Sequence, residues 1–217
     1  MDQAFSDRGW RGSPDLWLGA AYELLLESGV EAVKILPLAK KLNLSRTSFY
    51  WFFKDREELL QALLCRWRDK NTGSIVRRAE AYADTLIEAI LNVSDCWFDN
   101  DLFDSKFEFA VRSWALQSPD ILAEVHKADQ RRLDALKRMF LRFGHDEMSA
   151  DVRSRTIYLL QIGYISMQTS EDIELRLRRM PEYVKVFAGE AAQPRELDRF
   201  FSRHGISRPN GKAGNDG

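Results

Sequence analysis

The stretch LSRTSFYWFFKDREELL, residues 44–60, decides the fold because it holds one short helix and the start of the next. Ser45 can cap a helix that runs to about Phe53, and Asp55 can cap the helix that follows. Five aromatic residues stand in a row between these caps. Such a row could form a buried plug, a membrane anchor or a contact surface.

The helical period divides this aromatic row between two faces. At about 100° per residue, Phe49 and Phe53 fall on one arc, which we expect to face the core. Tyr50 and Trp51 fall on the other arc, beside Arg46. An outward aromatic pair next to a cation indicates a contact surface. The alternative is an ordinary amphipathic helix whose outer aromatic side chains pack on a neighbouring element.

The outward side chains have the chemistry to contact double-stranded DNA. Arginine reads guanine edges and a threonine methyl group meets a thymine methyl group, whereas tyrosine, tryptophan and lysine donate to phosphate oxygens. The expected contact residues are Arg46, Thr47, Tyr50, Trp51, Lys54 and Arg56. Residues 33–56 carry a net charge of +5, although the whole chain carries −1. A basic segment on a mildly acidic chain indicates a polyanion contact, and a solvated helix face is the alternative.

The segments on either side of this stretch complete a helical motif. Residues 35–42 form a short helix, and Asn43 suits the left-handed backbone of a tight turn. Two short helices joined by such a turn form a helix-turn-helix, whose second helix enters the major groove of DNA. An earlier helix opens at Ser13 and closes at Gly29. The rest of the chain has no alternating strand pattern, and further helices are expected near 75–97, 105–117, 119–143, 149–169, 172–187 and 195–203.

The composition excludes several classes of protein. The chain has 217 residues with 45% hydrophobic and 30% charged residues, which is typical of a globular protein in solution. We expect no membrane span, no secretory signal, and a cytoplasmic location with Cys65 and Cys96 as reduced thiols. Three scattered histidines and the lack of a glycine-rich phosphate loop or nucleophile motif predict no metal, no cofactor and no enzymatic activity.

Over residues 15–65 the sequence resembles the TetR family of bacterial transcriptional regulators. The family pattern has a glycine that closes the first helix, an alanine in the second, and a Gly-Val-Ser-like turn. It continues with Leu-Tyr-x-His-Phe and Lys-x-Lys/Arg-Glu-Glu-Leu. The matching residues here are Gly29, Ala39, Asn43-Leu44-Ser45, Phe49-Tyr50-Trp51-Phe52-Phe53 and Lys54-Asp55-Arg56-Glu57-Glu58-Leu59. The resemblance implies an all-α fold with an N-terminal three-helix helix-turn-helix domain and a C-terminal helical bundle.

The resemblance also implies roles for individual residues. It places Arg46 and Thr47 at base-reading positions. It places Ser48, Tyr50 and Trp51 at backbone-contact positions, and Lys54 and Arg56 at phosphate positions, while Lys34 can reach a further phosphate. Phe52 stands where the family usually has histidine, so we expect one phosphate contact fewer.

The expected domains follow from the same resemblance and from the composition. They are a flexible arm (1–12), a helix-turn-helix domain (13–56), a linking helix (56–70), a ligand-binding and dimerisation domain (71–206) and a disordered tail (207–217). Aromatic residues are plentiful in the C-terminal domain, where they either form its core or line a cavity for an apolar or aromatic effector. The candidate ligand-binding residues are Phe107, Trp114, Phe140, Gln161, Tyr164 and Gln168.

The resemblance implies a homodimer with a helix near 150–169 in its interface. The candidate interface residues are Ile157, Leu160, Gly163, Tyr164 and Met167. The sequence therefore predicts a homodimeric, sequence-specific DNA-binding regulator, a repressor that leaves a palindromic operator when a small effector binds. The alternative is a helical interaction protein, or an effector-independent regulator with weakened DNA binding.

Overall fold

The structure, a computed structural model, describes residues 11–205, and within that range every regular element is helical. This confirms the predicted all-α fold. None of the helices in the described range is both long and apolar enough to cross a membrane. The predicted tail (207–217), and the predicted arm (1–12) apart from its last two residues, lie outside the described residues.

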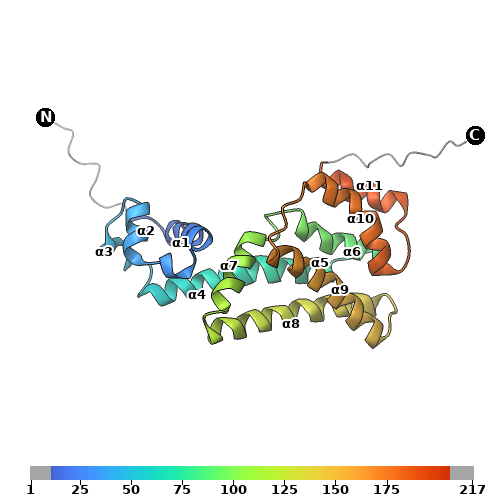
Figure 1. Cartoon of the computed structure of the whole chain (residues 1–217), viewed down its shortest axis with the longest axis horizontal. Coiled ribbons are helices and arrows are strands. Elements are labelled where there is room, and N and C mark those ends of the chain that lie inside the picture. The colour runs from blue at the N-terminus through green and yellow to red at the C-terminus, as the bar shows by residue number, and fades with distance from the viewer. Residues whose placement is uncertain (1–10, 206–217) are drawn as a thin grey trace, which may run out of the picture. The chain divides into compact units, whose positions relative to one another are not determined.

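The chain divides into two compact units (Figure 1). Unit 1 takes its described residues from 11–69 and 106–125, and unit 2 from 70–105 and 126–205. The predicted boundary at residue 71 places 106–125 with the C-terminal domain, whereas the structure groups this segment with the N-terminal helices. A buried hydrogen bond of 2.7 Å from the Trp67 indole N–H to the Glu108 carboxylate is one physical reason for this grouping.

Unit 1 contains the helix-turn-helix. Its elements are α1 (Pro14–Ser28), the 3₁₀ turn η1 (Val30–Ala32), α2 (Ile35–Lys41), α3 (Arg46–Phe49), α4 (Arg56–Trp67) and most of α7 (Ser105–Ala115). Helix α1 packs against α2 and α4, and α2 packs against α3 (Figure 1). Ser13 caps α1 by accepting a hydrogen bond from the Leu16 amide, and Gly29 ends the helix at a φ of 77°.

The core of unit 1 confirms the division of the aromatic row. Phe49 is fully buried and Phe53 nearly so. The Phe49 ring meets Trp17 of α1 edge to face, with 5.4 Å between ring centroids, and lies 5.6 Å from Phe53. Edge-to-face aromatic pairs of this kind contribute about 0.5–1.5 kcal/mol beyond the area they bury. These contacts hold α3 against α1 and leave the next two aromatic residues on the outside.

The turn after α2 agrees with the prediction, whereas α3 is shorter than predicted. Asn43 has a φ of 52°, as predicted for a residue of the tight turn after α2. Helix α3 was predicted to reach about Phe53, but regular α-helix stops at Phe49. The amides of Trp51 and Phe52 then bond to carbonyls three residues earlier, which tightens the last turn.

Unit 2 is a bundle built around α6. Its elements are the π-helical turn η2 (Arg68–Thr72, of which residues 70–72 belong here), α5 (Gly73–Glu80), α6 (Leu86–Ser94), η3 (Asp95–Trp97), most of α8 (Pro119–Arg142), α9 (Glu147–Ser166), α10 (Ile173–Ala188) and α11 (Pro194–Arg203). Helix α6 contacts α5, α10 and α11, and α9 contacts α10.

The prediction of one helix over 75–97 is wrong. The segment forms α5 and α6 with a break at 81–85. Thr85 caps α6 because its hydroxyl accepts a hydrogen bond from the Glu88 amide at 3.0 Å, while the Glu88 carboxylate accepts one from the Asp84 amide at 2.9 Å. These two hydrogen bonds stabilise a helix start that the apolar periodicity alone conceals.

Candidate functional site

Six of the eight predicted DNA-contact residues are exposed on unit 1. They are Lys34, Arg46, Thr47, Tyr50, Trp51 and Lys54. Tyr50 and Trp51 are the most informative, since 53% and 60% of their surfaces are accessible, whereas the other aromatic residues of unit 1 that the structure describes are partly or fully buried. Adjacent exposed apolar side chains form the kind of surface patch that marks many interaction sites. This cluster, called the contact surface below, combines two aromatic side chains with cations.

Capping and stacking set the geometry of the contact surface. The Ser45 hydroxyl accepts a hydrogen bond from the Ser48 amide at 3.2 Å and so starts α3. The Arg11 guanidinium carbon lies 3.7 Å from the centroid of the Trp51 ring, which places a cation over the face of the indole. The start of α3 is therefore capped, and one face of the Trp51 ring already carries a cation.

Part of the positive charge of residues 33–56 is balanced by carboxylates of α1. Lys41 lies 3.0 Å from Glu23 and 3.6 Å from Glu27, and its hydrogen bond to Glu23 raises its pKa. Within residues 11–205, Arg46 and Lys54 form no side-chain ion pair. These two cations remain available to a polyanion.

Two predicted contacts need correction. Arg56 was expected to meet a phosphate, but its guanidinium donates to the Val33 carbonyl at 2.6 Å and the Val30 carbonyl at 2.7 Å. It is therefore engaged in joining the start of α4 to the turn before α2. Ser48 is buried, with its hydroxyl 2.9 Å from the Ser45 hydroxyl, so its side chain does not reach outward. Helical spacing cannot reveal these contacts. The partners of Arg56 are two backbone carbonyls, and the partner of Ser48 is the residue that caps α3.

Phe52, at the position where the family usually has histidine, is half-buried. It belongs neither to the core pair of Phe49 and Phe53 nor to the exposed pair of Tyr50 and Trp51. Its ring cannot supply the hydrogen bond that a histidine offers to a phosphate.

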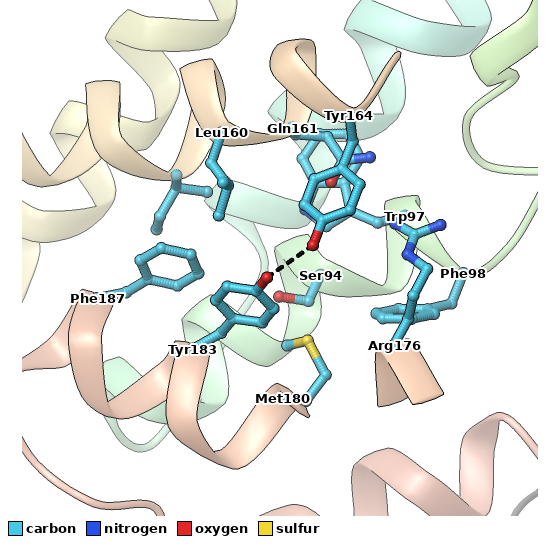
Figure 2. A pocket seen from close by; sticks show the side chains of 11 residues that line it. Ser94, Trp97, Phe98, Leu160, Gln161, Tyr164, Arg176, Met180, Tyr183 and Phe187 are labelled. Atoms are coloured by element: carbon cyan, nitrogen blue, oxygen red, sulfur yellow. Dashed lines mark hydrogen bonds between the residues drawn. The ribbon is translucent and has the colours of Figure 1, made fainter. Parts of the chain in front are cut away.

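A pocket lies within unit 2 among α6, η3, α9 and α10 (Figure 2). It encloses about 430 Å³, its open mouth included. The aromatic residues Trp97, Phe98, Tyr164, Tyr183 and Phe187 form much of its wall. An apolar wall with a few convergent polar groups is typical of small-molecule sites.

Most polar groups of this pocket come from α9 and α10, and Ser94 of α6 adds a hydroxyl group. The hydroxyl groups of Tyr164 and Tyr183 lie 2.8 Å apart and share a hydrogen bond, which raises the pKa of Tyr183 (Figure 2). The guanidinium carbon of Arg176 lies 5.3 Å from the centroids of both the Phe98 and the Tyr164 rings. Gln161 completes the polar lining.

The predicted ligand-binding residues do not line one pocket. Only Gln161 and Tyr164 reach this one. Phe107 and Trp114 belong to the core of unit 1, where the Phe107 ring meets Tyr22 edge to face at 5.1 Å. Phe140 is fully buried against His145, and Gln168 is exposed just beyond α9.

The sequence prediction missed Arg176, Met180, Tyr183 and Phe187, which all line the pocket. Their spacing of four, three and four residues along α10 is the signal that places them on one helical face.

Helix α9 has apolar residues on two opposite sides. Ile157 and Tyr158 are buried, whereas Val152, Leu159 and Met167 are exposed by 54%, 56% and 79%. Of the predicted interface residues, Leu160 and Met167 are exposed, Ile157 is buried in unit 2, Gly163 is half-buried, and Tyr164 lines the pocket. The outer side of α9 is therefore better represented by Val152 and Leu159 than by Ile157 and Tyr164.

The helix-turn-helix of this chain matches a family of known proteins. Residues 18–63 match the model of the bacterial regulatory proteins of the tetR family. Over 79 residues the chain is 32% identical to the uncharacterized HTH-type transcriptional regulator YvkB of Bacillus subtilis strain 168, a match that covers 36% of this chain. The matched region spans only 40% of the length of that relative.

Solved structures share most of the fold at low sequence identity. A transcriptional regulator of the TerR/AcrR family from Aquifex aeolicus VF5 has a TM-score of 0.62 at 19% identity, covering 81% of this chain and 99% of its own. AmtR of Mycobacterium smegmatis has a TM-score of 0.60 at 14% identity, covering 95% and 100%. SmeT, the repressor of the Stenotrophomonas maltophilia multidrug efflux pump SmeDEF, has a TM-score of 0.53 at 18% identity, covering 88% and 90%.

Proposed function

We propose that this chain, which belongs to the TetR family of bacterial transcriptional regulators through its N-terminal domain, is a homodimeric repressor that binds a palindromic DNA operator. We further propose that a small apolar or aromatic effector releases it from the operator. The observation that carries the DNA-binding proposal is the exposure of Tyr50 and Trp51 just after α3, the helix that begins with Arg46 and is packed on α1 through Phe49.

The contact surface has groups for both kinds of DNA contact. Arg46 and Thr47 stand at the start of α3, where an arginine can donate two hydrogen bonds to a guanine. Tyr50, Trp51 and Lys54 follow the helix and carry donors that suit phosphate oxygens. We assign the reading of bases to Arg46 and Thr47. The other three residues are assigned to the phosphates of the DNA backbone.

Gel shifts with the duplex that lies upstream of the protein's own coding sequence test this assignment. Arg46→Ala should reduce the preference for operator over scrambled DNA by about 1–3 kcal/mol, whereas Lys54→Ala should weaken binding to both duplexes alike. Arg178→Ala, an exposed arginine of α10, is the matched control and should change neither. If the folded protein binds no duplex at low salt, the chain is instead a helical interaction protein.

The homodimer proposal rests on the exposed apolar side of α9. Val152, Leu159 and Met167 lie on this side, and the neighbouring helix α10 adds exposed Val186. An uncovered apolar surface on two adjacent helices suits a second copy of the same chain, which would bury both at once. Two copies would present their recognition helices to half-sites about 34–36 Å apart.

Sedimentation equilibrium tests the dimer. The wild-type chain should sediment as a dimer, and Leu159→Glu should shift it toward the monomer because a charge on this side is costly to bury. The control Glu182→Gln alters an exposed residue of α10 without adding a charge and should leave the dimer intact.

The effector proposal rests on the aromatic pocket in unit 2. An effector weakens DNA binding only if it binds a second conformation better than the DNA-bound one, and such coupling is typically about 5- to 150-fold in affinity. SmeT is a repressor with a related fold, which supports the choice of repressor over activator.

A further inference from the structure

The pocket in unit 2 contains one cation that its surroundings leave without a counter-charge. Arg176 lines the pocket, and within residues 11–205 no carboxylate forms an ion pair with it. The neighbouring arginines of α10 differ in this respect, because Arg178 is paired with Glu174 at 3.2 Å and Arg179 with Glu171 at 2.7 Å. Arg176 is therefore the available positive charge of this pocket.

The surroundings of Arg176 fix the orientation of its guanidinium. Figure 2 shows the side chain rising from α10 beside Phe98 toward Tyr164. The guanidinium carbon lies 5.3 Å from each of these ring centroids, so aromatic contacts hold it while its N–H groups form no hydrogen bond within the described residues. A guanidinium held in this way can still offer two parallel N–H donors to a planar anion.

The other residues that line the pocket favour a ligand with an aromatic ring. Trp97, Tyr183 and Phe187 offer aromatic surface, and Met180 adds an adaptable apolar side chain. Of the two hydroxyl groups in the Tyr164–Tyr183 pair, only one hydrogen is used in their mutual bond, so the other can be donated to a ligand. The pocket is partly open, so a ligand need not be fully enclosed by it.

We propose that this pocket binds a small aromatic carboxylate, with the carboxylate on the guanidinium of Arg176 and the ring among the aromatic side chains. The proposal deepens the effector part of the proposed function and rests on it only for the consequence on DNA. A phosphate ester is a poorer match, because a phosphate carries more charge than one guanidinium balances in an apolar pocket.

Calorimetric titration of the full-length protein tests the proposal. Benzoate and 2-naphthoate are each compared with their neutral amides, which keep the ring and remove the charge. At least one carboxylate should bind about tenfold or more tightly than its amide. Arg176→Gln should lower carboxylate affinity about 10- to 100-fold and leave amide affinity nearly unchanged.

Two further variants distinguish the role of Arg176 from a general effect of removing an arginine. Arg178→Gln removes a paired, exposed arginine from the same helix and should bind like the wild type. Arg176→Lys keeps the charge but not the paired donors, and it should retain a reduced preference for the carboxylate. Circular dichroism checks that each variant is folded.

Three results would overturn the proposal. They are no saturable binding of either carboxylate at millimolar concentration, equal binding of carboxylates and amides, or equal losses in Arg176→Gln and Arg178→Gln. DNA binding is measured separately by fluorescence anisotropy. If duplex binds but no carboxylate does, the ligand inference fails and the regulator stands. If carboxylates bind through Arg176 without releasing DNA, the site stands and the effector role fails.

Discussion

Arg56 offers a clear test of whether a basic residue of the helix-turn-helix serves DNA or the fold. Its guanidinium donates to two backbone carbonyls, those of Val30 and Val33, at 2.7 Å and 2.6 Å. Hydrogen bonds to charged groups contribute about 1.5–3 kcal/mol each. Because Arg56 is half-buried, water can hydrogen-bond to the two carbonyls that Arg56→Met leaves without a donor. We therefore expect a loss of about 2 kcal/mol in the free energy of unfolding of unit 1.

Two assays on the same variant separate the alternatives. In urea, Arg56→Met should lower the unfolding midpoint of unit 1 by about 1 M, since slopes for chains of this size are about 2–3 kcal/mol per M. Its DNA affinity should keep the wild-type dependence on salt, because no phosphate contact is lost. Lys54→Met, the matched control, should keep its midpoint and lose about 0.9 from the slope of log affinity against log salt. An unchanged midpoint with a reduced salt slope for Arg56→Met would refute the structural role.

Further outcomes follow from single contacts. Phe49→Ala should cost about 3–5 kcal/mol and unfold the helix-turn-helix, as seen in thermal melts, whereas Ser45→Ala should cost about 1 kcal/mol by removing the cap of α3. Burial raises the pKa of Cys96 to about 12, so a thiol reagent at pH 8 should label only Cys65 in the folded protein and both cysteines in urea. The pKa of Asp146 is lowered by the hydrogen bond from the Ser149 amide, so the folded state favours the carboxylate. The resulting stability is complete above the unfolded pKa near 4 and should be lost on further acidification, and Asp146→Ala should remove this dependence in melts between pH 5 and pH 2.5.

The sequence was informative where helical phase and turn geometry decide the outcome. Helical phase separates Phe49 and Phe53 from Tyr50 and Trp51, and their burial confirms it. The left-handed backbone at Asn43 follows from its side chain in the same way. In each case the local backbone conformation sets the direction of the side chain, so the spacing contains the answer.

Contacts between distant segments were not predictable in this way. Arg56 bonds to carbonyls 23 and 26 residues earlier, and Phe107 packs on Tyr22. Helical periodicity identifies the side of a helix but not the element that covers it. The ligand candidates therefore spread over two units, while Arg176 and Tyr183 were assigned no role in the pocket.

The break between α5 and α6 has a different cause. The apolar pattern of 75–97 suits one continuous helix, but Thr85 and Glu88 form a cap inside it. The spacing of Thr85 and Glu88 fits the usual capping pattern of a helix start, and recognising it would have divided the segment correctly.

The central claim is that the contact surface binds DNA. Fluorescence anisotropy of the labelled upstream duplex, titrated with wild type and Arg46→Ala over a range of salt concentrations, measures this. We predict that wild-type affinity falls steeply as salt rises, and that Arg46→Ala loses about 1–3 kcal/mol of its preference for this duplex over a scrambled one. Salt-independent or absent binding by folded wild-type protein would contradict the account.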